Sequence, residues 1–374
     1  MEASNRPLRK VNGRIAIGVD PGYGATKVAV YKPRDNGDPR FALAVTPSVV
    51  GLPTGNTDAR LFADGKIRRR DTKMPHAIRF AKDGGDYDYL VGPHLDTYAN
   101  SIERMDFDRF TSGTQLALIY ASISELLNPG FTDGVIMAVG LPVQLLLGDG
   151  ENRRIVRGIA KNLEGEHKWV FDSQRFGMFI SKVNCKVAQP LGSFFEWGLD
   201  CNGVWQRAKN DATAPVAVID MGYNTIDCLV SSGGQISSHT RGDTIGMRRA
   251  CELATALVSR AYGQVYLSLH EADTMLREYL KNGDAYAYVG GQQVSTSGAC
   301  RDALESVASD ALNFAERTLG RRATQYRILL TGGGGAALFE MFSKHYRQAE
   351  LLYQPVTANA RGLLKVATSI AGRL

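Results

Sequence analysis

The sequence predicts an α/β fold with two related halves, and three observations support this prediction. Short apolar runs rich in Val and Ile recur along the chain and end at Gly, Asp or Pro, as the inner strands of helix-covered sheets do. Between them lie segments with apolar residues at three- and four-residue intervals, which is the spacing of amphipathic helices. Finally, the turn within "IGVDPGYGATKVAV" (17–30) recurs within "VAVIDMGYNTIDCLV" (216–230).

The individual elements follow from these patterns. Buried strands are expected at 14–19, 134–141, 215–220 and 326–332. Helices are expected at 113–127, 246–262 and 301–319. A polar, glycine-rich stretch from 32 to about 100 is too long for one loop of a compact domain, so we expect an inserted subdomain there. A shorter insertion is expected within about 262–300, in the second half of the chain.

The composition is that of an ordinary globular chain long enough for two domains. Of its 374 residues, 44% are hydrophobic and 22% are charged, so a full core can be buried. The formal net charge of +6 allows an acidic partner without requiring one. The five cysteines include no Cys-x-x-Cys pair, which argues against a disulfide framework or a zinc site. We recognise no export signal or membrane span and expect a cytoplasmic protein.

The first turn, DPGYGATK, combines residue types that suit phosphate and a metal ion. Gly22 and Gly24 allow the backbone to bend tightly and to approach a ligand, so that successive N–H groups can point at phosphate oxygens. Thr26 adds a hydroxyl donor, and Lys27 adds a positive charge. Asp20 would repel phosphate directly, but it is suitable if Mg²⁺ lies between, because that ion keeps several waters and uses few carboxylates.

The second turn, DMGYNTID, repeats this logic with Asp220, Gly222, Asn224 and Thr225. Glycine would be the easier residue at position 224, but Asn also tolerates a left-handed backbone conformation. Two such turns on facing domains are expected to clamp a polyphosphate from both sides. The sequence matches neither the Walker loop nor the dinucleotide-binding fingerprint. Taken alone, each turn is also explained as a β-hairpin turn that begins at Asp.

A third glycine cluster, "LLTGGGGAALFE" (329–340), follows another expected strand and precedes a helical segment. Its glycines, Gly332 to Gly335, can let an adenine or a ribose lie flat against bare backbone. On its own, this run is also explained as a tight strand-to-helix turn. The recurrence of the three features in this order favours the interpretation that the chain binds a nucleotide.

These residues resemble the motifs of the actin-like ATPases, the superfamily that also includes sugar kinases and heat-shock chaperone ATPases. DPGYGATK is similar to its first phosphate motif, DMGYNTID to its second and LLTGGGGAAL to its adenosine motif. The segments at 138–142, 186–198 and 241–254 are similar to the bacterial plasmid-segregation branch called ParM or StbA, to which the Alp proteins also belong. The resemblance covers about residues 14 to 370.

The resemblance implies an actin-like fold, with two RNase H-like domains that each carry a subdomain insertion and with the nucleotide in the cleft between them. Domain I would span residues 14–190 and domain II residues 191–355. A C-terminal helix at about 356–374 would pack back on domain I.

The resemblance also implies roles for individual residues. Gln189 would orient the water that attacks the terminal phosphate, a positional task because an amide is no strong base. The alternative interpretation is that Gln189 is only a polar loop residue before Pro190. Asp20 and Asp220 would act in catalysis and hold Mg²⁺ through water. Nucleotide contacts would come from Gly22, Tyr23, Gly24, Thr26, Lys27, Gly222, Tyr223, Asn224, Thr225, Asp243, Arg248, Glu252, Gly332, Gly333 and Gly334, with Asp243, Arg248 and Glu252 near the ribose.

The function implied is an ATPase that polymerises into filaments with ATP, or GTP, and Mg²⁺, and that hydrolyses the nucleotide. Its role would be plasmid DNA segregation through a DNA-binding adaptor of the ParR type on a centromere-like site. Two alternatives stay open: a bacterial cytoskeletal filament unrelated to plasmids, and a small-molecule kinase of the same superfamily, which would need a catalytic carboxylate base. The basic residues Arg68, Arg69 and Arg70 are interpreted as a solvated loop, with DNA, an adaptor or a neighbouring subunit as alternative contacts.

Overall fold

The computed structural model describes residues 8–33, 39–53, 75–92, 95, 101–102, 105–263 and 266–374, so Arg68, Arg69 and Arg70 lie outside the described residues. The chain divides into two units, each with its own sheet. Unit 1 consists of Met1–Arg207 and Asn359–Leu374, and unit 2 consists of Ala208–Ala358. The α/β fold class is confirmed, because helices cover a mixed sheet in each unit.

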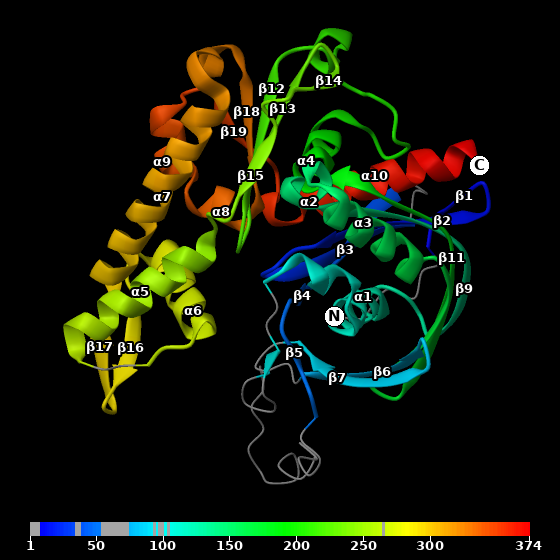
Figure 1. Cartoon of the computed structure of the whole chain (residues 1–374), viewed down its shortest axis with the longest axis horizontal. Helices are drawn as coiled ribbons and strands as arrows, with labels where there is room; N and C mark the ends of the chain where they lie inside the picture. The colour runs from blue at the N-terminus through cyan, green and yellow to red at the C-terminus, as the bar shows by residue number, and fades with distance from the viewer. Residues whose placement is uncertain are drawn as a thin grey trace. The chain divides into compact units, whose positions relative to one another are not determined.

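Unit 1 is built on a mixed sheet that has eleven strands within the described residues (Figure 1). They are β1 (Lys10–Val11), β2 (Arg14–Pro21), β3 (Ala25–Pro33), β4 (Pro39–Pro47), β5 (Val50–Gly51), β6 (His76–Lys82), β7 (Gly85–Val91), β8 (Ser101–Ile102), β9 (Gly130–Leu141), β10 (Gly165–Phe171) and β11 (Gln174–Ala188). The sheet order is β4-β3-β2-β9-β11-β10-β6-β7-β5-β8, and β1 pairs with β2. At its centre, β2 is antiparallel to β3 and parallel to β9.

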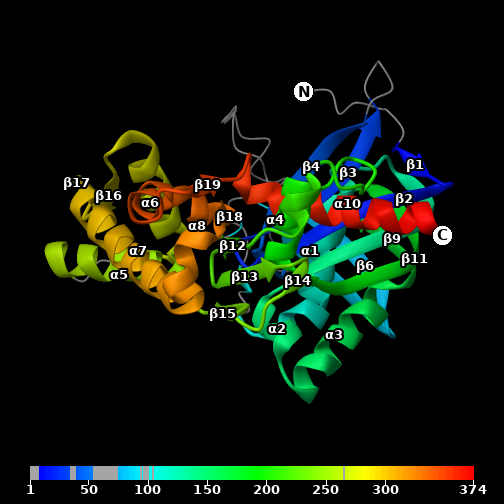
Figure 2. The ribbon, with the colours of Figure 1, turned by 90° about the horizontal axis from the view of Figure 1, so that it is seen from above.

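The helices of unit 1 cover both faces of this sheet. They are the 3₁₀ helix η3 (Phe107–Thr111), α1 (Gly113–Ser124), α2 (Val143–Leu147), α3 (Gly150–Leu163), α4 (Gln189–Gly198) and α10 (Ala358–Arg373). Helix α1 packs against β3, β4, β6, β7 and β10. On the opposite face, apolar residues of α10, such as Leu363 and Leu364, pack on Ala16, Ala29 and Ile136. Figure 2 shows α10 running along β2 with α4 beside it.

Helices α4 and α10 are fixed to each other by close packing and by buried charges. A Cβ on Gly362 would lie 1.7 Å from the carbonyl oxygen of Gly192, so the two backbones cross in direct contact. Beside this crossing, Glu196 pairs with both Arg361 and Lys365, each at 2.9 Å. Arg361 is only 1% exposed. Since breaking a buried ion pair strands an unpaired charge, this cluster holds α4 firmly in place.

Unit 2 repeats the central strand arrangement of unit 1. Its strands are β12 (Val216–Met221), β13 (Ile226–Ser232), β14 (Gln235–Ile236), β15 (Arg241–Asp243), β16 (Tyr286–Val289), β17 (Gln292–Ser295), β18 (Arg327–Thr331) and β19 (Ala349–Leu351). The main sheet has the order β14-β13-β12-β18-β19, with β15 paired to β13, while β16 and β17 form a separate hairpin. Here β12 is antiparallel to β13 and parallel to β18, as β2 is to β3 and β9.

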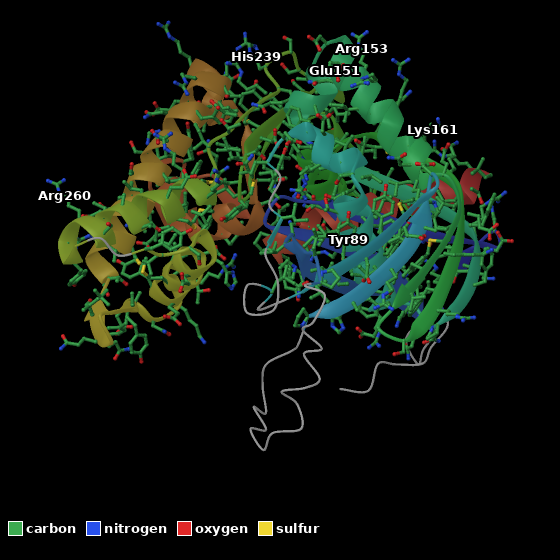
Figure 3. All side chains as sticks on the ribbon, turned by 60° about the horizontal axis from the view of Figure 1, so that its bottom comes forward. Tyr89, Glu151, Arg153, Lys161, His239 and Arg260 are labelled. Atoms are coloured by element: carbon green, nitrogen blue, oxygen red, sulfur yellow. The ribbon has the colours of Figure 1, made fainter. Side chains whose placement is uncertain are left out.

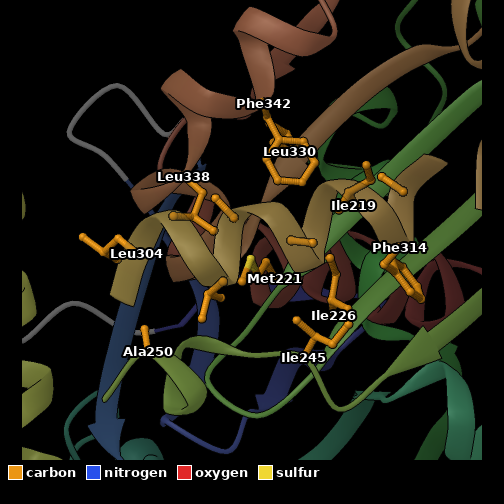
Figure 4. Packing of buried hydrophobic residues seen from close by; sticks show 14 of the residues in the cluster. Ile219, Met221, Ile226, Ile245, Ala250, Leu304, Phe314, Leu330, Leu338 and Phe342 are labelled. Atoms are coloured by element: carbon orange, nitrogen blue, oxygen red, sulfur yellow. The ribbon is translucent and has the colours of Figure 1, made fainter. Parts of the chain in front are cut away.

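The helices of unit 2 enclose a continuous apolar core. They are η4 (Lys209–Ala212), α5 (Met247–Tyr262), α6 (Leu269–Asn282), α7 (Ser297–Leu319), η5 (Gly320–Gln325), α8 (Gly332–Ala337), α9 (Phe339–His345) and η6 (Pro355–Thr357). Phe314 and Leu304, toward the two ends of α7 in Figure 4, belong to the same buried cluster as Ile219, Leu330 and Phe342. The 23 residues of α7 are anchored by this row of buried side chains, because a helix gains most of its stability from packing its apolar face.

Every strand and helix expected from the apolar patterns is present. The strands are β2, β9, β12 and β18, and the helices are α1, α5 and α7. Within the stretch 32–100, residues 39–47 form β4, which pairs with β3 along its whole length at the edge of the main sheet. The stretch 262–300 contains α6 and the β16–β17 hairpin. No helix in the described ranges has the length and apolar character needed to cross a membrane.

Candidate functional site

The first acid–glycine turn joins β2 to β3 and places a buried carboxylate beside two of the predicted site residues. Asp20 is the penultimate residue of β2, stands opposite Lys27 in the strand register and is 2% exposed. Its Oδ2 atom accepts a hydrogen bond from Lys27 Nζ at 3.2 Å, and its Oδ1 atom accepts one from Gln189 Nε2 at 2.7 Å. The fold therefore brings Asp20, Lys27 and Gln189 together.

Gln189 is held in one orientation by its surroundings. It is the first residue of α4 and is 6% exposed. Gly140, near the end of β9, leaves room for it, since a Cβ there would lie 3.3 Å from Gln189 Cγ. Because the Nε2 atom donates to Asp20, the side-chain oxygen of Gln189 is defined as an acceptor. A fixed acceptor of this kind can orient a water molecule.

Ser48 holds the backbone of the first turn through hydrogen bonds to its carbonyl groups, on the side that faces the rest of unit 1 (here called the protein side). The Ser48 hydroxyl donates to the carbonyl oxygen of Gly22 at 2.7 Å, and the Ser48 N–H donates to the carbonyl oxygen of Gly24 at 3.1 Å. The buried Thr26 hydroxyl lies in the same network, 3.4 Å from Ser48 Oγ, and accepts from Gln115 Nε2 at 3.2 Å. Thr26 thus faces inward, which leaves Lys27 and the backbone as donors on the other side of the turn.

A buried arginine completes this network. Nη2 of Arg109, in η3, donates to the carbonyl oxygen of Gly22 at 3.1 Å and to Oε1 of Gln115 at 2.8 Å. The guanidinium carbon lies 4.6 Å from the centre of the Tyr23 ring, which also packs edge-on against Phe110. The Tyr23 ring is therefore part of the interior, and Tyr23 can contact a ligand through its backbone.

The turn glycines are needed for close approach and not for a left-handed backbone. Gly22, Gly24, Gly222 and Asn224 do not have positive φ values, so the expectation that Asn224 would adopt a left-handed conformation is wrong. A Cβ on Gly22 would lie 2.8 Å from both the carbonyl oxygen of Ala25 and Lys27 Nζ. The short four-residue span between paired strand ends brings these groups together without any inversion of φ.

The second turn joins β12 to β13 and is held by the start of α5. The N–H of Met247 donates to the carbonyl oxygen of Gly222 at 3.1 Å, and the N–H of Arg248 donates to that of Tyr223 at 2.7 Å. Gly246 permits this approach, because a Cβ there would lie 2.3 Å from the Tyr223 carbonyl oxygen. The Tyr223 ring packs against the core of unit 2. As in the first turn, the loop carbonyls are bonded on the protein side.

Asp220 occupies the same strand position as Asp20. It is the penultimate residue of β12, is 7% exposed and stands opposite Asp227 in the register. The hydroxyl of Thr225 donates to Asp227 Oδ2 over 3.5 Å, a long hydrogen bond. Two carboxylates thus lie at the base of this turn, and Thr225 is directed toward the second of them.

The third glycine cluster forms the link from β18 to α8, next to Asp220. Gly332 has φ of +80°, and a Cβ on it would lie 2.4 Å from the Met221 carbonyl oxygen and 2.5 Å from Asp220 Oδ1. Gly334 packs on the Met221 side chain, because a Cβ on Gly334 would lie 2.6 Å from Met221 Cγ. Gly333 is different, because it is exposed and a Cβ there would meet nothing within 4 Å. Close packing therefore explains why positions 332 and 334 are glycines. Gly333 makes no such contact, and its backbone is exposed at the surface.

The three residues expected near a ribose lie close in sequence but make local contacts. Asp243 ends β15, and its carboxylate accepts from the N–H of Thr244 at 2.7 Å. Arg248 and Glu252, one turn apart on α5, form an ion pair at 2.9 Å and are both partly exposed. Each of the three can therefore reach solvent from the start of α5 or the strand before it.

The side chains near the turns can hold a metal ion only through the water molecules that hydrate it. In the described ranges, no group of three or more His, Cys, Asp and Glu side chains is arranged to hold a metal. Both oxygens of Asp20 already accept a hydrogen bond, although each keeps a further lone pair. A carboxylate in this state can bind a water of hydrated Mg²⁺, which uses one or two carboxylates and keeps its remaining waters.

Family comparisons match both halves of the chain. The model of the N-terminal domain of actin-like proteins matches residues 18–192, and the model of the C-terminal domain of archaeal MreB-like actin homologues matches residues 218–344. The chain belongs to the actin-like ATPase superfamily. No curated protein sequence is similar to this actin-like chain.

Solved structures share the actin-like fold at low sequence identity. Ta0583, an archaeal actin homolog, has a TM-score of 0.69 and 17% identity, covering 94% of this chain and 99% of its own. Bacillus thuringiensis ParM with ATP has a TM-score of 0.64 and 14% identity, covering 95% and 98%. The actin-like protein Alp7A has a TM-score of 0.68 and 14% identity, covering 96% and 97%. The predicted actin-like fold is confirmed.

Four residues that shape the two turns of this actin-like chain were not predicted from the sequence: Ser48, Arg109, Gln115 and Gly246. Arg109 and Gly22 are 87 residues apart, and nothing in the sequence around Arg109 marks it as buried. Gly246 carried only a signal for the helix start, because a glycine directly before a strongly periodic segment is a candidate N-cap.

Proposed function

We propose that this chain binds ATP through its two acid–glycine turns. One observation carries the proposal: the carbonyl oxygens of Gly22, Gly222 and Tyr223 are all hydrogen-bonded on the protein side. In a trans peptide the N–H points opposite to the carbonyl, so the N–H groups of Tyr23, Tyr223 and Asn224 point away from those partners. Backbone N–H groups aligned in this way suit phosphate oxygens.

Mg²⁺ would be held through its waters by Asp20 and Asp220. Each carboxylate is buried at the base of a turn and cannot bind phosphate directly without repulsion. The bound ion supplies charge neutralisation for the phosphates. In unit 1, Lys27 adds a fixed ammonium beside Asp20, at 3.2 Å, which suits a terminal phosphate.

Hydrolysis would depend on Gln189. Its Nε2 atom is committed to Asp20, and its oxygen would accept a hydrogen bond from the attacking water. Such positioning is the main protein contribution in phosphoryl transfer, where little covalent chemistry falls to the side chains. The nucleoside would contact the bare backbone at Gly333, with Asp243, Arg248 and Glu252 available to the ribose.

We further propose that ATP binding drives assembly into filaments and that the filaments segregate plasmid DNA in the cytoplasm through a DNA-binding adaptor of the ParR type. The support is membership of the actin-like superfamily and likeness to ParM, one of whose solved forms contains ATP. A head-to-tail contact that does not close on itself generates a filament. These steps rest on family analogy.

Light scattering, phosphate release and negative-stain microscopy of the purified protein test this proposal together. The reactions contain Mg²⁺ with ATP, GTP, ADP or no nucleotide, and a fifth set replaces Mg²⁺ with EDTA. We expect filaments with a triphosphate that disassemble as phosphate is released, and neither signal in EDTA. Tight ATP binding without polymer would contradict the filament proposal and direct the search to a kinase substrate. Absence of ATP binding would contradict the whole proposal.

A further inference from the structure

Arg109 is a buried cation directly behind the first turn. It is 4% exposed, and its guanidinium contacts are the carbonyl oxygen of Gly22, the side-chain oxygen of Gln115 and the faces of Tyr23 and Phe110. It forms no ion pair with a carboxylate in the described part of the chain. Its hydrogen-bond acceptors and ring neighbours are all neutral, while the carboxylates of Asp106 and Asp20 act on its charge without a direct contact.

Hydrogen bonding alone does not explain why a charged group stands at this place. The Gly22 carbonyl already accepts from the Ser48 hydroxyl at 2.7 Å, which is shorter than its 3.1 Å contact with Arg109. A buried guanidinium with no carboxylate in direct contact is costly, because it loses its hydration and the carboxylates of Asp106 and Asp20 compensate it only in part. Burial lowers the pKa of Arg109 to about 10, so it still carries its proton at neutral pH. What Arg109 adds to the turn is therefore positive charge.

The second turn has an equivalent source of positive potential. There, the loop carbonyls of Gly222 and Tyr223 accept from the N–H groups of Met247 and Arg248, the first two residues of the 16-residue helix α5. The N-terminus of a helix carries a partial positive charge. Among the described residues, no helix N-terminus donates to the first turn, and the Gly22 carbonyl accepts from the Ser48 hydroxyl and the Arg109 guanidinium instead.

We infer that Arg109 is a positioning residue for polyphosphate: it holds the Gly22 carbonyl inward, so that the Tyr23 N–H points to the ligand side, and its charge stabilises an anion bound at the turn. This inference rests on the proposed nucleotide function and deepens it. The ligand class is a di- or triphosphate, because the contribution of a nearby cation grows with the negative charge at the turn. A nucleoside without phosphate would gain nothing from Arg109.

The test compares Arg109→Met, which removes the charge and keeps much of the side-chain length, with Arg109→Lys, which keeps the charge. Arg153→Met is the matched control, since Arg153 is an exposed arginine on α3 (Figure 3). Isothermal titration measures the Kd of each full-length protein for ATP, ADP and adenosine. We expect Arg109→Met to raise the Kd for ATP at least tenfold, to raise that for ADP less and to leave that for adenosine within twofold. Arg109→Lys should recover part of the loss.

Hydrogen exchange of the nucleotide-free proteins supplies a second readout. We expect faster exchange in the peptide that contains residues 20–27 for Arg109→Met, and no change there for Arg153→Met. An ATP Kd within twofold of wild type, or an equal loss for ATP and adenosine, would overturn the inference. If Arg109→Met does not fold, Arg109→Lys provides the test instead. A tenfold rise in the ATP Kd of Arg109→Lys, as large as the rise expected for Arg109→Met, would overturn the inference equally. A wild-type protein that fails to bind ATP would instead refute the proposed function.

Discussion

Gln189 donates a hydrogen bond of 2.7 Å from Nε2 to Oδ1 of Asp20, across 169 residues of sequence. Asp20 belongs to the first turn, whereas Gln189 begins α4, the helix that Glu196, Arg361 and Lys365 fix to α10. The carboxylate proposed to hold Mg²⁺ thus also fixes the amide proposed to orient water. A change in either residue is therefore expected to affect both tasks.

Replacing Gln189 by Met tests the water-orienting role. Met has a similar volume but no amide, so packing beside Gly140 is kept while the acceptor oxygen is lost. We expect phosphate release to slow by about 10²-fold, the effect typical of lost positioning in an active site. ATP-dependent filaments should form and persist longer. Light scattering followed together with phosphate release in one reaction measures both effects.

The control for this variant is its ATP affinity. The substitution also removes one donor from buried Asp20, which costs about 1–3 kcal/mol of folding stability. Thermal unfolding would report that loss separately. A Gln189→Met protein that binds ATP and releases phosphate at the wild-type rate would remove Gln189 from the catalytic site.

Replacing Asp220 by Asn tests the metal role of the second turn. Asn keeps the shape of the side chain but lacks the negative charge that would attract hydrated Mg²⁺. We expect phosphate release to fall at least about 10²-fold, which corresponds to roughly 2.7 kcal/mol, while the melting temperature changes little. Titration of Mg²⁺ at fixed ATP is the deciding measurement, and an unchanged Mg²⁺ dependence would contradict the assignment. Asp220→Ala should likewise abolish hydrolysis with the fold intact.

The sequence predicted the central elements because each is encoded locally. The runs at 14–19 and 215–220 are apolar at every position from 15 to 19 and from 216 to 219, and such runs are typical of strands buried on both faces. The two acid–glycine turns were visible because each lies within eight consecutive residues. Their carboxylates, Asp20 and Asp220, accordingly occupy matching positions at the ends of β2 and β12.

The site contacts that were not predicted from the sequence join segments that are distant along the chain. The bonds from Arg109 and Ser48 to the Gly22 carbonyl span 87 and 26 residues, and neither side chain carries a local signal of its role. Thr26 was predicted as a phosphate donor because its position in the motif suggested it. The period-2 alternation of β3 instead directs its hydroxyl toward α1, where Gln115 donates to it.

The glycine cluster offers a matched pair of substitutions. Gly332→Ala would place a methyl group at φ of +80°, within 2.4 Å of a carbonyl oxygen, and should cost at least about 1–2 kcal/mol in unfolding free energy. Gly333→Ala meets nothing within 4 Å and lies in the first turn of α8, so stability should change by less than about 1 kcal/mol. We nevertheless expect Gly333→Ala to weaken ATP binding, because the methyl group covers bare backbone proposed to face the nucleoside.

Chemical denaturation and ATP titration of both variants separate these effects. If Gly333→Ala binds ATP as tightly as wild type, the proposed nucleoside contact is wrong. If Gly332→Ala is as stable as wild type, the backbone there must relax in a way that the packing against Met221 does not suggest.

A buried histidine in unit 1 gives stability a pH dependence. His167 lies between Tyr120, whose hydroxyl is 2.7 Å from Nδ1, and the carbonyl oxygen of Leu163, 2.9 Å from Nε2. The carbonyl requires Nε2 to carry a proton, so Nδ1 of the neutral ring accepts from Tyr120. Burial, aided by nearby Lys82, lowers the pKa of His167 below its ordinary value of 6.5, although the bond to Leu163 opposes this.

This lowered pKa determines the sign of the effect. Above pH 6.5 the ring is neutral in both folded and unfolded chains. As the pH falls, the unfolded chain binds the proton first, so the contribution of His167 to stability declines until the pH passes below the folded pKa, at no more than about 1.4 kcal/mol per pH unit. Urea unfolding between pH 7.5 and 5 should therefore show a steeper loss for wild type than for His167→Gln, which can keep both hydrogen bonds without titrating. Equal slopes for the two proteins would show that His167 is protonated in the folded state as readily as in the unfolded one.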